Sequence, residues 1–227
     1  MSRVTLSASA ALVLLLAACG GSSSGDGPTL DEQIDNELDD NDGQLTGRVI
    51  TTPDGRRYVV DAVDPNADGN VSGYVIAGQL DGSNNIIGIN QATIAGRPYD
   101  TATTTGRFDY SGDTVALLSK DGGNFNRLTG ESELTIDFGN QTGRIESFAE
   151  GGGATAEVEG SLTFDRTSGS FEANSVRMEY TDDTGTRSGA AGVFGSLHGD
   201  NEGFSGLYDA LGNDGIEGVG VMAGERD

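Results

Sequence analysis

The sequence is poor in the residues that build metal centres and disulfides. Its 227 residues include one cysteine, one histidine, four prolines and no tryptophan. One cysteine excludes an intramolecular disulfide, and it also excludes a cysteine-cluster zinc site or an iron–sulfur centre. A single histidine leaves no room for a multi-histidine metal site. The fold must therefore rely on packing and backbone pairing rather than on such crosslinks.

Positive charge is also scarce. Lysine and arginine number 13 against 36 aspartates and glutamates, which gives a formal net charge of -23, and Lys120 is the only lysine. A field this negative repels phosphate backbones, so nucleic acid is not expected as a partner. The charge has two interpretations: general solvation, as in proteins of saline habitats, or an acidic surface that attracts a cationic partner. The near-absence of lysine favours solvation.

Residues 1–18 are typical of a bacterial lipoprotein signal peptide. Arg3 supplies the positive start, and the apolar run over 10–16 is too short for a stable transmembrane helix. The run closes on a Leu-Ala-Ala-Cys sequence that resembles a lipobox, so Cys19 is the predicted lipidation site. Triacylation would make anchoring stable. Gly20 follows in place of an aspartate, which favours the outer membrane.

Residues 19–43 are predicted to form a disordered tether. The segment begins with GGSSSGDG after the cysteine and continues into the acidic stretch DEQIDNELDDND. Small residues and like charges favour an extended, solvated chain that would hold the folded part off the membrane. A short amphipathic helix over 30–38 is the alternative, which the density of acids makes marginal.

From residue 44 onward the pattern indicates an all-β fold. Turn residues recur at intervals of about 8–14 residues, the rhythm of an antiparallel barrel or sandwich. Between the turns, apolar residues alternate with polar ones, which places the following on one face of their strands: Leu134, Ile136, Phe138, Ala156, Val158, Leu162, Phe164, Val176, Met178 and Tyr180. Phe171 and Ala173 fall in the opposite phase, which predicts a β-bulge near Asn174.

Glycines inside many of these strands favour a small, strongly coiled barrel over a flat sheet. Residues 101–227 are therefore predicted to form an antiparallel eight-stranded β-barrel. Residues 44–100 are predicted to form a smaller, handle-like β segment. Whether that segment is a separate unit or adds strands to the barrel is left open by the sequence.

Short glycine-rich motifs in the C-terminal half follow an order that resembles one protein family. The motifs are YSG from Tyr110, LTIDF from Leu134, GRI from Gly143, GSF from Gly169, GAAGVFG from Gly189 and GVGVMAGERD from Gly218. Together they resemble the barrel of transferrin-binding protein B and its smaller lipoprotein relatives. The last strand departs from the family pattern, since Met222 and Ala223 stand where an aromatic residue and a glycine are usual.

The resemblance implies a lipoprotein of the Gram-negative outer membrane, surface-exposed after export by a Slam-type translocon. It also implies a single lobe of handle and barrel, whereas large members have two lobes and bind host transferrin. Smaller relatives bind haem or factor H. We therefore expect a non-catalytic binding module for an iron source, haem or a protein ligand, and transferrin itself is not expected in so short a chain.

One segment has the spacing of a calcium loop. Asp64, Asn66, Asp68 and Asn70 alternate, and a glycine before the last of them would make the sharp bend. The twelfth position is a valine instead of the bidentate glutamate. A hydrophilic turn between strands is the alternative to a Ca²⁺ site, because the same residue types are favoured there.

His198 is the candidate ligand-binding residue, at the expected end of a strand. A haem iron could use its imidazole, and an exposed loop histidine is the alternative. No nucleophile elbow is present and the carboxylates suit wet strand faces, so an enzyme is not expected. Two further functions stay open: a structural lipoprotein that contacts proteins without a small ligand, and a calcium-stabilised adhesion-type module.

Overall fold

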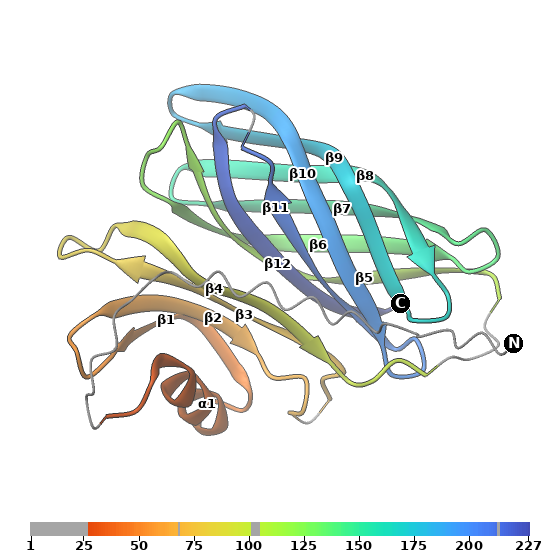
Figure 1. Ribbon diagram of the computed structural model, residues 1–227, viewed down its shortest axis with the longest axis horizontal. Helices are drawn as coiled ribbons and strands as arrows, with labels where there is room; N and C mark the ends of the chain where they lie inside the picture. The colour runs from red at the N-terminus through yellow and green to blue at the C-terminus, as the bar shows by residue number, and fades with distance from the viewer. Residues whose placement is uncertain (1–26, 68, 101–104, 213) are drawn as a thin grey trace, which may run out of the picture.

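The computed structural model contains a four-stranded sheet with one helix and a separate closed barrel (Figure 1). It describes residues 27–67, 69–100, 105–212 and 214–227. The sheet lies beside the barrel, and the helix covers the face of the sheet that points away from it (Figure 1). In these ranges no helix is long and apolar enough to cross a bilayer. The predicted all-β fold with an eight-stranded barrel is confirmed.

The single helix, α1 (Leu30–Asp40), begins with a complete capping box. The hydroxyl of Thr29 accepts a hydrogen bond from the Glu32 amide (3.3 Å), and the Glu32 carboxylate accepts one from the Thr29 amide (2.7 Å). Ile34 and Leu38, one turn apart, are buried against the sheet. The helix is therefore fixed at its start by its cap and along one face by packing.

The prediction of a disordered tether over 19–43 is wrong where α1 forms. The density of acids was expected to destabilise a helix here. Two of the acids, Asp31 and Glu32, lie in the first turn, where negative charge interacts favourably with the helix dipole. Burial of the apolar pair supplies tertiary stabilisation that composition alone does not reveal. The signal peptide, Cys19 and the start of the predicted tether lie outside the described residues.

The N-terminal sheet, called the handle sheet below, has four antiparallel strands in sequence order: β1 (Gln44–Thr51), β2 (Arg57–Val63), β3 (Ser72–Leu80) and β4 (Ile86–Gly96). On β2, Tyr58, Val60 and Ala62 pack toward α1. Val59 and Asp61 point the other way, toward the barrel. The question left open by the sequence is thereby answered, because the segment forms its own layer beside the barrel.

The barrel is a meander of eight antiparallel strands: β5 (Arg107–Lys120), β6 (Asn126–Asp137), β7 (Thr142–Gly151), β8 (Ala154–Asp165), β9 (Ser170–Asp182), β10 (Gly185–His198), β11 (Gly203–Ala210) and β12 (Ile216–Arg226). Pairing of β12 with β5 closes it. All ten apolar residues that the alternation placed on one face are buried in its interior. The period-two pattern therefore identified the inward side chains correctly.

The predicted β-bulge near Asn174 is confirmed. The stretch of β9 from Ala173 to Val176 is one residue longer than the stretch of β10 that pairs with it, from Ala191 to Val193. β9 also has one extra residue relative to β8 on its other side. Gly160 on β8 lies against the bulge, where an added Cβ would come within 2.6 Å of Val176 Cγ1. The valine of the bulge therefore occupies the space that the glycine leaves.

The handle sheet packs on the outer wall of the barrel formed by β5, β11 and β12. An apolar cluster joins the two units, and its buried members include Val59, Ile76, Ile86, Val115, Leu117, Leu207, Val219 and Val221. At the edge of the cluster, the Ser72 hydroxyl donates a hydrogen bond to the Gly224 carbonyl (3.2 Å). This contact holds the two units in one relative position.

Candidate functional site

The interior of the barrel is filled by its own side chains. Its largest buried members are aromatic: Tyr110, Phe138, Phe164, Phe171, Tyr180, Phe204 and Tyr208. The Phe138 ring meets those of Phe108 and Phe164 edge-on, with centroids 5.5 and 5.0 Å away. A ligand of haem size could enter only by displacing this core. Binding sites are therefore to be sought outside the barrel.

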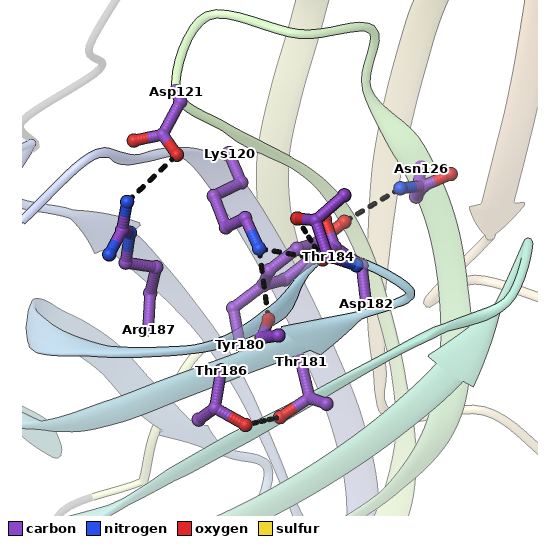
Figure 2. Close-up of polar contacts among 10 residues, drawn as sticks. Lys120, Asp121, Asn126, Tyr180, Thr181, Asp182, Thr184, Thr186 and Arg187 are labelled. Atoms are coloured by element: carbon purple, nitrogen blue, oxygen red, sulfur yellow. Dashed lines mark hydrogen bonds and ion pairs between the residues drawn. The ribbon is translucent and has the colours of Figure 1, made fainter.

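Polar contacts cross one mouth of the barrel (Figure 2). Lys120, at the end of β5, donates hydrogen bonds to Asp182 Oδ1 (2.6 Å) and to the Gly185 carbonyl (2.9 Å) at the β9–β10 turn. Strands β5 and β9 are four positions apart around the barrel, so these bonds span the opening. The Lys120 ammonium, and then the Thr184 hydroxyl, lower the pKa of Asp182 to about 2.

Two further contacts span the same opening (Figure 2). Asn126 on β6 donates to the hydroxyl of Tyr180 on β9 (2.6 Å), and Arg187 on β10 donates to Asp121 after β5 (3.1 Å). Each links strands that are not neighbours in the barrel. The cluster ties the mouth together, and we assign it a structural role.

A concave surface lies between the handle sheet and the barrel, and we call it the junction groove. It consists of two adjoining clefts of about 430 and 420 Å³, which share Gln44, Tyr74 and Asp113. One wall belongs to the handle sheet with its preceding turn, and the other to β5, β6 and β12. Because the two units are packed together, the groove is formed in advance of any ligand.

An ion pair joins the two walls inside the groove. Arg127 on β6 donates from Nε to Asp61 Oδ2 (2.7 Å) and from Nη2 to Asp61 Oδ1. The Gly47 amide also donates to Asp61 Oδ1 (2.8 Å). Gly47 has a φ of +58° at an irregularity in β1, and the guanidinium carbon lies 3.4 Å from where its Cβ would be. The positive φ favours a glycine here, whereas an added Cβ would make only ordinary van der Waals contact with the guanidinium.

Tyr74 lines both clefts from β3. The residue is only 6% exposed, and its ring belongs to the apolar cluster beneath the handle sheet. Its hydroxyl has no hydrogen-bond partner in the part of the chain that the structure describes. Burial, followed by the nearby carboxylates of Asp61 and Asp113, raises the pKa of Tyr74, so the hydroxyl is neutral at physiological pH. A neutral hydroxyl can both donate and accept a hydrogen bond.

Carboxylates line the groove without basic partners. They are Asp42, Asp113, Glu131 and Glu225. Across the described ranges, none of the four forms an ion pair with lysine or arginine. The described chain also contains no cluster of three or more histidine, cysteine, aspartate or glutamate side chains arranged for a metal. The unpaired carboxylates give the groove a surplus of negative charge, which attracts cations.

The segment with calcium-loop spacing forms a hydrogen-bonded turn. Asp64 Oδ1 accepts bonds from the Asn66 amide (2.8 Å) and from Asn66 Nδ2 (3.1 Å), and Asn70 Nδ2 donates to the Asp64 carbonyl (2.9 Å). Asp68 lies outside the described residues. The contacts of Asp64, Asn66 and Asn70 are those of the hydrophilic turn that was the alternative, and Ca²⁺ binding stays a prediction.

His198 is buried, so the expectation of an exposed loop histidine is wrong. It is 8% exposed, its Nδ1 lies 3.1 Å from the Arg97 carbonyl, and its Nε2 lies 2.7 Å from Ser205 Oγ. Its ring packs against Gly96, at the end of the handle sheet. Burial lowers the pKa of His198. Both ring nitrogens are engaged, so haem ligation would require breaking a bond and remains untested.

Reasoning from the sequence missed the residues that form the groove. One signal was available: Asp61 interrupts an apolar run, Tyr-Val-Val-Asp-Ala-Val, and a carboxylate on a buried strand requires a partner. Arg127, Tyr74 and Asp113 carry no comparable local signal. They come together only when the handle sheet packs on the barrel.

No family model matches this chain. No curated protein matches its sequence. Solved structures do match, and this chain spans 36% to 38% of the length of three of them, all of transferrin-binding protein B.

Two of these structures are mutants of the vaccine antigen transferrin-binding protein B from Haemophilus parasuis Hp5. The double mutant matches with a TM-score of 0.50 and 16% identity over 79% of this chain. The single mutant matches with a TM-score of 0.50 and 14% identity over 82%. Intact Ap-TbpB, with N and C lobes, gives a TM-score of 0.48 and 15% identity over 81%. At this identity the likeness concerns the fold alone: this chain has the fold of a transferrin-binding protein B lobe.

Proposed function

We propose that this chain is a lipid-anchored, non-catalytic module that captures a protein ligand, such as an iron-carrying protein, at the surface of a Gram-negative cell. The observation that carries the proposal is the filled barrel, whose interior core and crossed mouth leave only outer surfaces for a ligand. A partner with a large surface of its own suits such a site better than a small molecule does.

The shared fold supports the same proposal. The matched structures are of a protein whose name states that it binds transferrin. A fold can host several functions, so the ligand of this chain is argued from its own surface. Haem, the other candidate from the sequence, is less well supported because the only histidine has both ring nitrogens in hydrogen bonds.

The lipid anchor is inferred from the lipobox-like motif Leu-Ala-Ala-Cys, whose last residue is Cys19. Ten residues separate Cys19 from Leu30, the first residue of α1. At about 3.5 Å per residue-to-residue step, the eleven steps from Cys19 to Leu30 span at most about 39 Å. The handle sheet would then lie near the bilayer, and proteins approaching from outside the cell would meet the folded lobe directly.

Two measurements test the proposal. Native mass spectrometry of the protein from its own host should give the mass of the lipidated chain without a retained small molecule. Protease added to intact cells should digest the chain. A retained haem would overturn the choice of a protein ligand. Resistance on intact cells, with digestion only after the outer membrane is lysed, would overturn the surface location.

A further inference from the structure

The junction groove has walls that do not need a ligand to hold them. The apolar cluster packs the handle sheet on β5, β11 and β12, and the pair between Asp61 and Arg127 links the walls inside the groove. A cleft that is already shaped loses little conformational entropy when a ligand enters it. This makes the groove a better candidate for recognition than the loops at the barrel ends.

The hydroxyl of Tyr74 is an unused polar group inside this groove. The side chain is more than nine-tenths buried and lines both clefts, yet the hydroxyl has no bond to any described residue. The ring is buried, but the hydroxyl oxygen is not among the fully buried unpartnered atoms of the described residues, so it opens onto the groove and can bond to water or to a ligand. A ligand that bonded to Tyr74 would supply the missing partner.

The charges around this hydroxyl indicate which ligand fits. The guanidinium of Arg127 is neutralised by Asp61, whereas Asp113, Glu131 and Glu225 have no basic partner. The surplus negative charge favours a cation, and the hydroxyl and carboxylate oxygens favour one that donates hydrogen bonds. Ammonium and guanidinium groups combine both properties.

We propose that the junction groove binds an extended basic segment of the protein ligand, with a lysine or arginine side chain held between the Tyr74 hydroxyl and the Asp113 carboxylate. The inference rests on the proposed function, since it names the part of the partner that this chain recognises. The two clefts adjoin along β5, where residues 111–113 line one and residues 113–115 line the other, and this succession suits an extended segment rather than a single small cation.

The test must separate the groove from the general attraction of a chain with a net charge of -23. The probe is a short fluorescein-labelled peptide of alternating lysine and serine, added to the detergent-solubilised full chain and followed by fluorescence anisotropy. Tyr74→Phe removes one hydroxyl without changing the charge. Asp113→Asn removes one carboxylate from the groove. Each should weaken peptide binding about tenfold.

Two matched variants control for these changes. Tyr58→Phe removes a hydroxyl from another buried tyrosine of the handle sheet, one that packs toward α1. Glu172→Gln removes an exposed carboxylate without a basic partner from β9, away from the groove. Each control should change the affinity by less than about twofold. If Tyr74→Phe binds like Tyr58→Phe, and Asp113→Asn like Glu172→Gln, the proposal is overturned.

A second experiment locates the peptide directly. A carbodiimide joins a lysine amine to a carboxylate in contact with it, and tandem mass spectrometry identifies the joined residue. Crosslinks to Asp113, Glu131 or Glu225 are expected. Crosslinks confined to carboxylates outside the groove, such as Glu157 and Glu172, would overturn the proposal.

The peptide-binding experiment and the experiments on the proposed function can give independent results. Surface digestion and the absence of a retained haem do not depend on the groove. If those results hold while Tyr74→Phe leaves peptide binding unchanged, the protein ligand is recognised elsewhere. If haem is retained and Tyr74→Phe still weakens peptide binding, the groove binds basic segments in a protein with a different main ligand.

Discussion

Arg127→Met should destabilise the protein much more than the loss of an exposed arginine. The substitution leaves the Asp61 carboxylate, whose side chain is 4% exposed, with only the Gly47 amide as a partner. Removing one member of a fully buried ion pair costs about 3–5 kcal/mol. Because the Arg127 side chain is 26% exposed, water weakens the pair, and we expect a loss of about 2–3 kcal/mol. The melting temperature should fall by about 5–10 °C.

A double variant tests the cause of this loss. In Asp61→Val with Arg127→Met, no buried charge is left without a partner, and the two apolar side chains can pack together. The remaining cost is the lost bond from the Gly47 amide, about 1 kcal/mol. The double variant should therefore be more stable than Arg127→Met alone, by about 1–2 kcal/mol.

The assay is urea unfolding followed by far-ultraviolet circular dichroism and by tyrosine fluorescence. Arg144→Met is the matched control, since Arg144 is 59% exposed and its pairs with Glu146 and Glu159 lie on the open barrel wall. The control should lose less than about 0.5 kcal/mol. If Arg127→Met and Arg144→Met are equally stable, or if the double variant is the least stable of all, the reasoning from an unpaired buried carboxylate is refuted.

Four further outcomes are expected. Gly160→Ala should cost about 1–3 kcal/mol in urea unfolding, because the new methyl group would lie 2.6 Å from Val176. The pKa of Asp182, about 2, is below its unfolded value of about 3.9, so the stability that its charge contributes is present above pH 3.9 and lost as the pH falls through 2. In Asp182→Asn the free energy of unfolding should therefore decrease less between about pH 4 and about pH 2 than in the unchanged protein. The pKa of His198 is lowered, so stability should fall as the pH drops below about 6.5, and His198→Gln should remove that slope. A chelator should leave the melting temperature unchanged, because Asp64 and its neighbours already bond to one another; a drop would support a bound Ca²⁺.

The barrel was predictable because its strands have one wet and one buried face. Inward residues such as Leu134, Val158 and Met178 recur at every second position, and this signal does not depend on what lies far away in the sequence. The change of phase in the apolar–polar alternation before Val176 predicted the β-bulge for the same reason. Register and closure follow once such strands are joined by short turns.

The helix was not predictable from the same kind of reasoning. The composition of α1 argues for a solvated segment, and its apolar face consists of three residues, Leu30, Ile34 and Leu38. That face is stable because the handle sheet offers Tyr58, Val60 and Ala62 to cover it. Most helical stability in proteins comes from such packing, which a single sequence shows only in part.

The groove was not predictable because its residues are separated by most of the chain. Asp42 precedes the handle sheet, Tyr74 lies on its third strand, and Glu225 is near the end of the last barrel strand. No local motif contains them. Their proximity depends on which barrel strands the handle sheet covers, and that follows from the apolar outer face of Val115, Leu117, Val219 and Val221.

The composition favours the interpretation that the negative charge serves general solvation, but this interpretation applies to only some of the carboxylates. On the wall formed by β7, β8 and β9, Glu146 and Glu159 lie directly opposite each other, which is unfavourable for like charges. Arg144 forms ion pairs with both carboxylates, and Arg177 forms a further ion pair with Glu159. These two carboxylates are therefore compensated from within the chain, whereas Glu157 and Glu172 on the same wall have no ion pair among the described residues. Asp113 and its neighbours in the groove also lack a basic partner, but they line a preformed cleft together with the Tyr74 hydroxyl. A cleft position beside a second hydrogen-bonding group, more than the number of carboxylates, therefore decides where a cationic ligand is held.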